Sequence, residues 1–483
     1  MNVAIAAAGS FTAPSAEART EPPLAWPTVQ IGDALKLING RAFKPTEWAK
    51  SGTPIVRIQN LNNPGAPFNY FQGELPSKFL LQNGELLFAW SGTPGTSFGA
   101  HIWRGGKAWL NQHIFKVLFD ESQFDKKFLQ LAINQNLAEY IRAAHGGAGL
   151  AHITKGKFEQ SELPVPPLPK QREIVSNIDK QFTRLDVGVT ALRRVQANLK
   201  RYRAAALKAA CEGRLVPTEA GLAKAENRKY QTGEELLARI LDARRKNWRG
   251  RGKYREPAAP NDVDLPPLPE GWTWATAEQL TDENRSITYG VIKLGAPVHD
   301  GIHVLRSSDV RHLRLDLEDV KRVAPDIAGE YRRTFLEGGE VLITVRGTLG
   351  GVVVVPRECR GFNISREVAM LAMVEPAIAK TAAIFIGAAP LQRWLTHRAK
   401  GIAYTGINIE TLKELPVPLP PLAEQARIVE EVERRLSVIE DLDAVVSTNL
   451  RRAMHLRQST LRRAFSREPA SCAIRDRSAA LRP

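Results

Sequence analysis

Two stretches of the chain place hydrophobic residues at the spacing of long, paired helices. In the first stretch, an apolar residue recurs every seven positions, at Ile178, Leu185, Leu192, Leu199 and Ala206. Phe182 and Val189 lie between these positions and form the other half of the seam. The second stretch repeats this pattern at Val432, Ile439, Val446, Ala453 and Thr460, with Leu436 and Leu450 between them. A sustained period of 3.5 residues is typical of coiled coils. We therefore predict a central spacer helix over 166–212 and a distal one over 415–466, each roughly 60 Å long and able to pair antiparallel.

Polar residues and end signals refine this prediction. Gln196 and Asp443 interrupt the two seams, and a polar seam residue can fix the register of a coiled coil at some cost in stability. Proline suits the first turn of a helix, and Gly213 is placed to cap the end of the first one. Arg467 stands at the corresponding place in the second. The alternative is an ordinary helical bundle.

The segments between and around these helices carry a different pattern. Residues 24–165 and 266–414 contain short apolar runs such as ELLFAW, HIFKVLF, EVLITV and GVVVVP, separated by Gly, Pro, Asn and Asp. This texture predicts short strands with a few helices, and so the α+β class. A linker over 213–265 holds an amphipathic helix that begins with a Thr232–Glu235 capping box. We expect flexible ends at 1–23 and 467–483.

The chain also repeats itself. The stretch PPLPKQREIV from Pro166 matches PPLAEQARIV from Pro420, at an offset of 254 residues. A fainter match aligns Glu85 with Glu340 in the segments ahead of the helices. Such a duplication organises the whole fold. We predict an internal pseudo-twofold repeat, with two globular α+β domains separated by two long antiparallel coiled-coil helices.

Composition narrows the function. The net charge is +16, and most of the excess lies in residues 166–260, which favours a polyanionic partner. No apolar run approaches the ~20 residues that span a bilayer, and no signal-peptide pattern is present, so we expect a cytoplasmic protein of a bacterium or archaeon without a membrane partner. The three cysteines and nine histidines lack metal-ligand spacing, so we expect no bound metal.

Polar loops between the predicted strands are the candidate DNA-contacting elements. Arg, Asn and Gln present fork-shaped hydrogen-bonding groups that match base edges, and Lys and Arg also contact phosphate. In the first domain the candidates are Arg57, Gln59, Asn60, Asn62, Ser91, Thr93, Arg104 and Lys107. In the second they are Arg306, Ser308, Asp309, Arg311, Arg346, Thr348 and Arg366.

The doubled PL-x-x-Q-x-x-IV block, the LPEGW segment at Leu268 and the helix ends together resemble the specificity subunits of type I restriction–modification systems. The resemblance covers about Trp26 to Ser466. It implies that each α+β domain is a target recognition domain for one half of a split site in double-stranded DNA. It also implies that the helices dock two modification (methyltransferase) subunits, which two restriction subunits can join.

The resemblance further implies that this chain binds no cofactor and is not an enzyme. S-adenosylmethionine, ATP and Mg are expected on the partner subunits. Because the two domains differ in sequence, the target should be asymmetric. The candidate docking and spacer residues are Leu168, Gln171, Ile178, Leu185, Leu192, Leu199, Leu422, Gln425, Val432, Ile439 and Val446. One departure from the pattern is Lys170, where the second copy keeps Glu424.

Two other classes of function stay open at this point. Adenine methylation needs Asp or Asn before Pro-Pro and an aromatic residue, whereas Pro-Pro here precedes leucine. GTPGTSFGA, from Gly92, lacks the Gly-Lys-Ser/Thr of a phosphate-binding loop. One alternative is nevertheless a self-sufficient nuclease or methyltransferase with unrecognised catalytic residues. The other is a coiled-coil adaptor that binds proteins without sequence-specific DNA binding.

Overall fold

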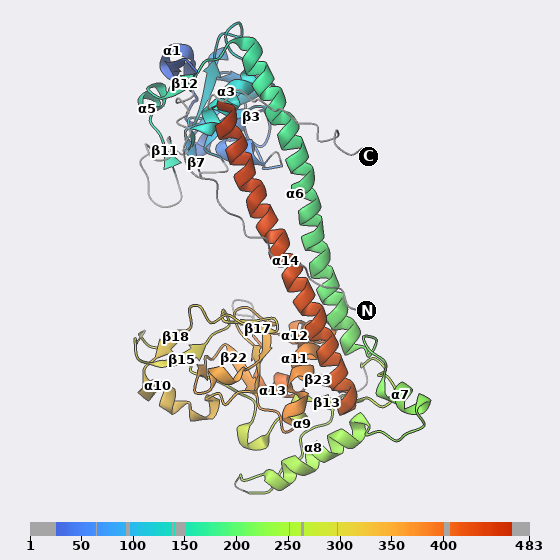
Figure 1. Cartoon of the computed structure of the whole chain (residues 1–483). Helices are drawn as coiled ribbons and strands as arrows, with labels where there is room; N and C mark the ends of the chain where they lie inside the picture. Colours follow the sequence, from blue (N-terminus) through green and yellow to red (C-terminus); the bar gives the residue numbers. More distant parts are fainter. Residues whose placement is uncertain are drawn as a thin grey trace, which may run out of the picture. The chain divides into compact units, whose positions relative to one another are not determined.

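The computed structural model describes residues 26–63, 65–92, 97–137, 140, 151–250, 252–261, 265–296, 298–399 and 406–465. The chain forms two compact units. Unit 1 comprises residues 1–191 and 448–483, and unit 2 comprises residues 192–447. Each unit therefore contains one α+β block and a part of both long helices (Figure 1).

Unit 1 is built from short strands and a few helices. Its strands are β1 (Thr28–Gln30), β2 (Lys36–Asn39), β3 (Thr53–Val56), β4 (Asn69–Phe71), β5 (Leu80–Leu81), β6 (Leu86–Ala89), β7 (Ser91–Gly92), β8 (Gly99–Ile102), β9 (Ala108–Leu110), β10 (Ile114–Leu118), β11 (Ala151–His152) and β12 (Glu162–Pro164). Its helices are α1 (Ile31–Ala34), α2 (Ile58–Asn62), α3 (Lys126–Gln135) and α5 (Lys155–Glu159), with 3-10 turns η1 (Pro45–Glu47) and η2 (Ser77–Phe79). Four-stranded sheets form in the orders β2-β10-β6-β8 and β4-β3-β9-β5, and β1-β12 and β7-β11 are two-stranded.

Unit 2 contains the linker and the second block. The linker carries α7 (Glu219–Ala225) and α8 (Gly233–Asn247). The strands are β13 (Thr273–Thr276), β14 (Thr288–Tyr289), β15 (Ile302–Leu305), β16 (Val310–Arg311), β17 (Arg314–Leu315), β18 (Lys321–Val323), β19 (Val341–Thr344), β20 (Val352–Val354), β21 (Asn363–Ile364), β22 (Val368–Leu371) and β23 (Pro416–Leu419). The helices are α9 (Ala277–Leu280), α10 (Pro325–Glu330), α11 (Ala379–Gly387), α12 (Ala389–Arg398) and α13 (Ile409–Lys413), with 3-10 turns η3 (Glu283–Arg285), η4 (Arg332–Thr334), η5 (Arg357–Cys359) and η6 (Pro376–Ile378).

The two blocks share one topology, which confirms the predicted repeat. The order β2-β10-β6-β8 of unit 1 recurs as β14-β22-β19-β20 in unit 2, and β4-β3-β9 recurs as β18-β15-β21. In both blocks one strand pair is parallel, β3 with β9 and β15 with β21. The runs ELLFAW, HIFKVLF, EVLITV and GVVVVP contribute β6, β10, β19 and β20, so the α+β prediction is also confirmed.

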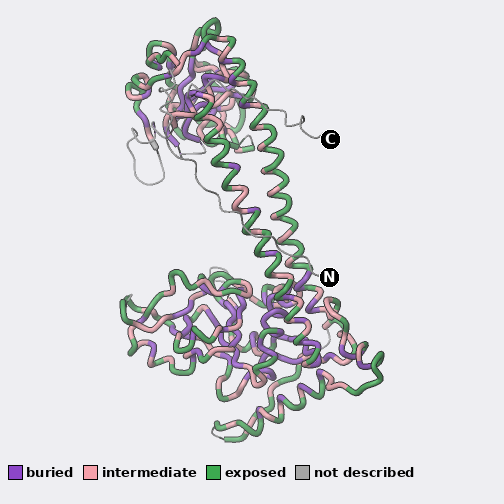
Figure 2. Tube along the Cα trace, in the orientation of Figure 1, coloured by how far each residue is buried: buried purple, intermediate pink, exposed green. Residues whose placement is uncertain are grey.

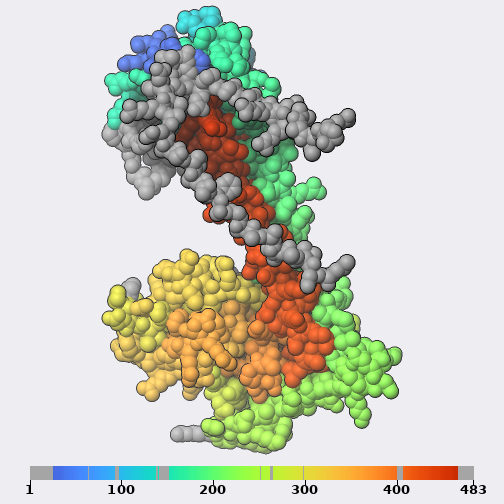
Figure 3. Space-filling view, in the orientation of Figure 1, coloured from blue at the N-terminus to red at the C-terminus, as the bar shows by residue number. Residues whose placement is uncertain are grey.

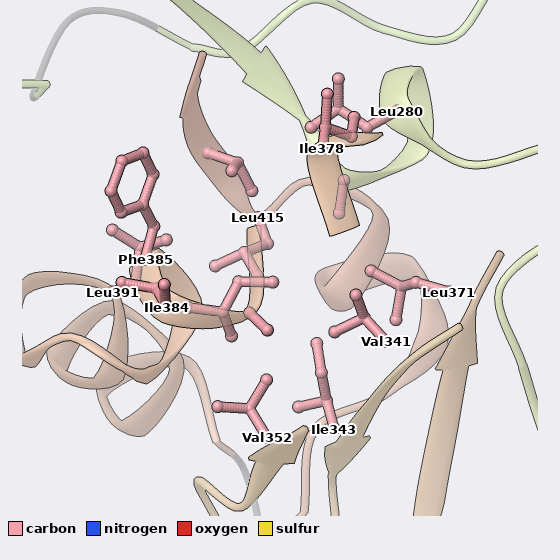
Figure 4. Packing of buried hydrophobic residues seen from close by; sticks show 14 of the residues in the cluster. Leu280, Val341, Ile343, Val352, Leu371, Ile378, Ile384, Phe385, Leu391 and Leu415 are labelled. Atoms are coloured by element: carbon pink, nitrogen blue, oxygen red, sulfur yellow. The ribbon is translucent and has the colours of Figure 1, made fainter. Parts of the chain in front are cut away.

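The core of unit 2 lies between its main sheet and the helices that follow it. Val341, Ile343 and Leu371 project from the sheet toward Ile384 and Phe385 of α11 (Figure 4). All five are at most 4% exposed. Figure 3 shows the first turns of the last helix packed directly against the orange residues of this unit. Burial of this apolar surface stabilises the block and gives its loops a fixed base.

Two 44-residue helices, α6 (Leu168–Cys211) and α14 (Leu422–Phe465), confirm the predicted coiled coil. In unit 1, Arg457 lies 3.1 Å from Asp186, and in unit 2 Arg203 lies 3.9 Å from Glu440. These two ion pairs are equivalent in the repeat. Asp186 corresponds to Glu440, and Arg203 corresponds to Arg457, each across the offset of 254 residues. Thr460 also contacts Gln181 in unit 1, and Gln196 contacts Asp443 in unit 2. In each unit the residue number on α14 falls as the residue number on α6 rises, so the two helices are antiparallel.

The seam between α6 and α14 is buried or half-buried at the predicted heptad positions. Buried or half-buried residues recur along one side of α14 among exposed ones (Figure 2). The two polar seam residues contact each other, with Gln196 donating to Asp443 at 3.2 Å. The repeat-equivalent positions in unit 1 are Leu450 and Val189. One layer of the seam is therefore polar in unit 2 and apolar in unit 1.

Gly213 ends α6 as predicted. Its φ is +65°, a left-handed conformation that favours glycine. The N–H of Arg214 donates to the carbonyl of Ala209 at 2.8 Å, the bond of a Schellman motif. The capping box of α8 is also present, with Thr232 and Glu235 each accepting from the other's backbone N–H.

An acid just before a central strand is repeated in both blocks but paired differently. In unit 1, Glu85 pairs with Lys116 of β10 at 2.6 Å. In unit 2 the equivalent acid, Glu340, is 2% exposed and pairs at 2.8 Å with Arg285 of η3. Met370 occupies the strand position of Lys116. The acid is thus retained while its cation comes from another element.

Candidate nucleic-acid interface

Three loops of unit 2 meet beside the ends of β15, β19 and β22. The Ser307 hydroxyl donates to Glu367 at 2.6 Å, and the N–H of Arg346 donates to the carbonyl of Glu367 at 3.3 Å. Gly347 has φ +72°, and a Cβ there would lie 3.0 Å from the Ser307 hydroxyl. Glycine therefore permits the close approach of two of these loops. The exposed side chains that the three loops present are Ser308, Arg346, Thr348 and Arg366.

Arg346 is the cation best placed to contact a ligand in this cluster. Its guanidinium lies 5.4 Å from the ring centre of Tyr289, whose hydroxyl donates to the carbonyl of Ile407 at 2.7 Å. Burial raises the pKa of Tyr289, with Arg346 opposing the shift. Arg346 pairs with no carboxylate among the described residues. Its five N–H donors therefore remain available, while the aromatic ring limits its motion.

Arg306 and Asp309 have a different environment. Asp309 is 4% exposed and accepts from the Arg306 side chain at 2.9 and 3.0 Å. Arg306 also donates to the carbonyl of Asp319 at 2.7 Å, and its hydrogen bond to Asp309 raises its pKa. Arg311 lies 3.8 Å from Asp316. The fork of Arg306 is thus occupied inside the loop, and this geometry favours a framework role.

Unit 1 repeats this turn. Asn60 is 3% exposed and accepts from the N–H of Arg57 at 3.0 Å, as Asp309 accepts from the N–H of Arg306. The Asn60 amide donates to the carbonyl of Ala66 at 3.2 Å. Gln59 is exposed, as is Asn62, and the Arg57 guanidinium lies 5.5 Å from the Trp48 ring. Asn60 therefore holds its loop, and its neighbours face outward.

An aromatic and histidine cluster in unit 1 was not predicted from the sequence. The Trp90 ring lies 5.2 Å from that of His113 and 4.6 Å from that of His152. Burial lowers the pKa of His113, with a smaller effect of His152. Trp90 Nε1 and His113 Nδ1 are buried without a hydrogen-bond partner among the described residues. Unpaired buried polar atoms are costly unless a partner arrives.

The repeat offset of 254 residues would have pointed to the neighbour of this cluster, Gln112, although not to the cluster itself. His113 is the counterpart of Glu367, and Gln112 is the counterpart of the candidate Arg366. Where Glu85 aligns with Glu340 the offset is 255 residues, so Ser91 is the counterpart of the exposed Arg346, and Ser91 is 6% exposed. Thr93 lies outside the described residues. The two blocks thus place different side chains at matching positions.

Arg104 and Lys107 lie apart from these loops, on the turn between β8 and β9. Both are exposed. Trp103 anchors the turn by donating to the carbonyl of Gly106 at 2.9 Å and packing edge-on against Phe68 at 6.4 Å. The turn offers two cations on a fixed base.

The predicted docking residues divide into two groups. Gln171 and Gln425 are at most 2% exposed and donate at 2.8 Å to the carbonyls of Pro166 and Pro420, respectively. These hydrogen bonds hold the starts of the two helices. The seam residues that are buried or half-buried within the helix pair are Ile178, Leu185, Leu192, Leu199, Val432, Ile439 and Val446, and Leu168 and Leu422 are half-buried at the helix starts.

Comparison with known proteins agrees with this architecture. Residues 23–188 and 301–440 match the sequence profile of the family described as the type I restriction modification DNA specificity domain. The two matched regions cover most of the chain and follow its repeat. The chain belongs to this family.

Several specificity subunits are similar over nearly the whole chain. The EcoBI specificity subunit of Escherichia coli is 27% identical over 92% of this chain and 86% of its own length. The EcoDI specificity subunit of the same species is 21% identical over 92% of this chain and 89% of its own length. A chain solved in a study of type I R-M complex assembly shares the fold, with a TM-score of 0.56 and 19% identity over 92% of this chain and 99% of that one.

The departure at Lys170 has a structural reason in this specificity subunit. Glu424, its counterpart, is fully buried and accepts from the N–H of Glu219 at 2.8 Å and from the Trp272 indole at 3.0 Å. Burial raises the pKa of Glu424. Lys170 instead pairs with Glu173 at 2.8 Å on the surface. Glu424 therefore attaches the linker to the first turn of α14, and a lysine at this position could not accept these two hydrogen bonds.

Proposed function

We propose that this specificity subunit reads a bipartite, asymmetric DNA site, with one α+β block on each half. The observation that carries the proposal is the matched set of loops in the two blocks. A common frame presents the exposed Arg346 and Arg366 in one block and has the buried Ser91 and the half-buried Gln112 at the matching positions of the other. Two α+β blocks that share one loop arrangement but carry different side chains are suited to two half-sites of different sequence.

The contacts within each half-site follow from exposure. In unit 2, Arg346 and Arg366 would read base edges, assisted by Ser308 and Thr348. In unit 1 that part would fall to exposed Gln59 and Asn62 with Arg57, and the polar atoms of Trp90 and His113 would gain partners on binding. Arg311, Arg104 and Lys107 would contact phosphate and make binding salt-dependent. Asn60, Arg306 and Asp309 would hold the loops in place.

We propose further that the chain is not catalytic and acts through two modification subunits, which two restriction subunits can join. S-adenosylmethionine, ATP and Mg would then be bound by those partners. No cluster of metal-ligating residues occurs in the described part of the chain. Burial raises the pKa of the Cys211 thiol to about 12, which removes it as a nucleophile.

Within the described part of the chain, no helix has both the length and the hydropathy to cross a membrane.

The test is to co-express the chain with the modification subunit encoded beside it and map methylated adenines across the host genome. We expect a split, asymmetric motif with a fixed gap. A stable complex without any motif would favour the adaptor alternative. Methylation or cleavage by the purified chain alone would contradict the non-catalytic proposal.

A further inference from the structure

An exposed apolar row runs along the helix pair in unit 2. Its members are Val195 and Tyr202 of α6 and Val438, Leu442 and Val445 of α14, and each is between 43% and 57% exposed. With the seam residues at heptad positions a and d, these five occupy only positions g and c. Exposed apolar residues that gather on one face mark an interaction surface more often than scattered ones do.

The five residues lie on one flank of the pair. In antiparallel helices the g positions of both border the same side of the seam, and c lies next to g on each helix. We name these five residues the unit 2 flank.

The repeat-equivalent flank of unit 1 is different. Its five positions hold Asn449, Leu456, Arg184, Gly188 and Ala191. Only Leu456 among them is a large apolar residue. Val187 and Met454 are also exposed, but they occupy positions f and e and so lie outside this row. A duplicated framework thus carries a strongly apolar flank in one copy and a mainly polar one in the other.

Charge beside the unit 2 flank indicates what would cover it. Arg194 and Arg201 occupy heptad position f of α6, one step beyond c on this side of the helix; both are exposed and pair with no carboxylate among the described residues. A helix with an apolar face bordered by acidic residues would complement both features.

We propose that the unit 2 flank binds the first modification subunit through such an amphipathic, acid-bordered helix, and that the unit 1 flank binds the second more weakly. This rests on the proposed function, and adds to it that the two docking sites are unequal. The assembly then proceeds in order, and the one-to-one complex is a populated species. The unit 2 block would be the first to be joined to a methyltransferase.

The test uses the full chain and the purified modification subunit, with native mass spectrometry following the one-to-one and two-to-one complexes as the modification subunit is added. Tyr202→Glu and Leu456→Glu are matched variants, because the two residues are repeat-equivalent and similarly exposed. We expect Tyr202→Glu to weaken the first step about tenfold, the size of one lost interface contact, and Leu456→Glu to leave that step unchanged. Leu442→Glu is a second variant expected to act as Tyr202→Glu does.

Other outcomes overturn the inference. Equal weakening of the first step by both matched variants, or no weakening by Tyr202→Glu and Leu442→Glu, would refute the unequal flanks. So would two binding constants in the ratio expected for identical sites. If these results came with a normal methylation motif, the proposed function would stand. A wild-type chain that recruited no modification subunit would refute the proposed function itself.

Discussion

The buried Glu340 pairs with Arg285, whereas its counterpart Glu85 pairs with Lys116, and this difference allows a direct test of the repeat. Glu340 accepts from the N–H groups of Glu337 and Gly338 at 2.7 and 2.9 Å and pairs with Arg285 at 2.8 Å. Arg285 also donates to the carbonyl of Phe335 at 3.0 Å. Replacing it by methionine leaves a buried carboxylate without its cation.

The expected cost of Arg285→Met is about 2–3 kcal/mol. Loss of one partner of a buried pair costs roughly 3–5 kcal/mol, and the lower figure here allows for an Arg285 side chain that is 24% exposed. Because the chain has two units, one global unfolding free energy is poorly defined. Hydrogen exchange of β19 and β22 measures the local effect, and we expect about 30- to 150-fold faster exchange there.

The decisive variant is the double substitution Arg285→Met with Met370→Lys. It moves the cation to the strand position that Lys116 holds in unit 1, where Lys116 reaches both Glu85 at 2.6 Å and the carbonyl of Leu80 at 2.9 Å. We expect the double variant to exchange more slowly than Arg285→Met alone, and Met370→Lys alone to exchange faster than wild type because two cations then compete for one site. Peptides of β6 and β10 are the internal control. A double variant no better protected than Arg285→Met would refute the equivalence of the two pairs.

Four further predictions concern recognition, spacing, the linker and acid titration. Arg346→Ala should relax base discrimination at one half-site by about 1–3 kcal/mol and Arg57→Ala at the other, measured by binding to single-base variants of the site; equal loss at both would indicate general phosphate contacts. Removing one heptad from each long helix shortens it by about 10 Å and should reduce the gap between half-sites by about three base pairs in the methylation motif, whereas an unchanged gap would contradict a spacer role. Glu424→Ala leaves the Glu219 N–H and the Trp272 indole without an acceptor, so limited proteolysis within 214–260 should be at least about tenfold faster than in a Lys170→Ala control, and equal rates would show that Glu424 does not hold the linker. The pKa of Glu431 is lowered to about 2, first by its hydrogen bond from Arg434 and then by that from Arg435, so its stabilising contribution should be complete above the ordinary value of 4.5 and lost as pH falls through about 2; carboxyl NMR titration checks this, and a midpoint near 4.5 would contradict it.

Local pattern predicted the long helices because their signals are short in range. The heptads of α6 and α14, the cap at Gly213 and the box of Thr232 with Glu235 each depend on residues a few positions apart. The contact between Gln196 and Asp443 was anticipated only as two polar interruptions, and their pairing required the register of two distant segments. The repeat supplied that link, because an offset of 254 residues relates both helices.

Sequence alone therefore determined the class, the duplication and the helices, since periodicity and capping are local properties of a chain. Tertiary structure decided which polar side chains face outward. Asn60 and Asp309 are residue types that can read bases, but both are buried in the turns that they stabilise. Gln112 and His113 lie beside the start of β10, and the pairing of β10 with β6 determines their position. Exposure and hydrogen-bond saturation depend on contacts between residues far apart in sequence, and no local pattern encodes them.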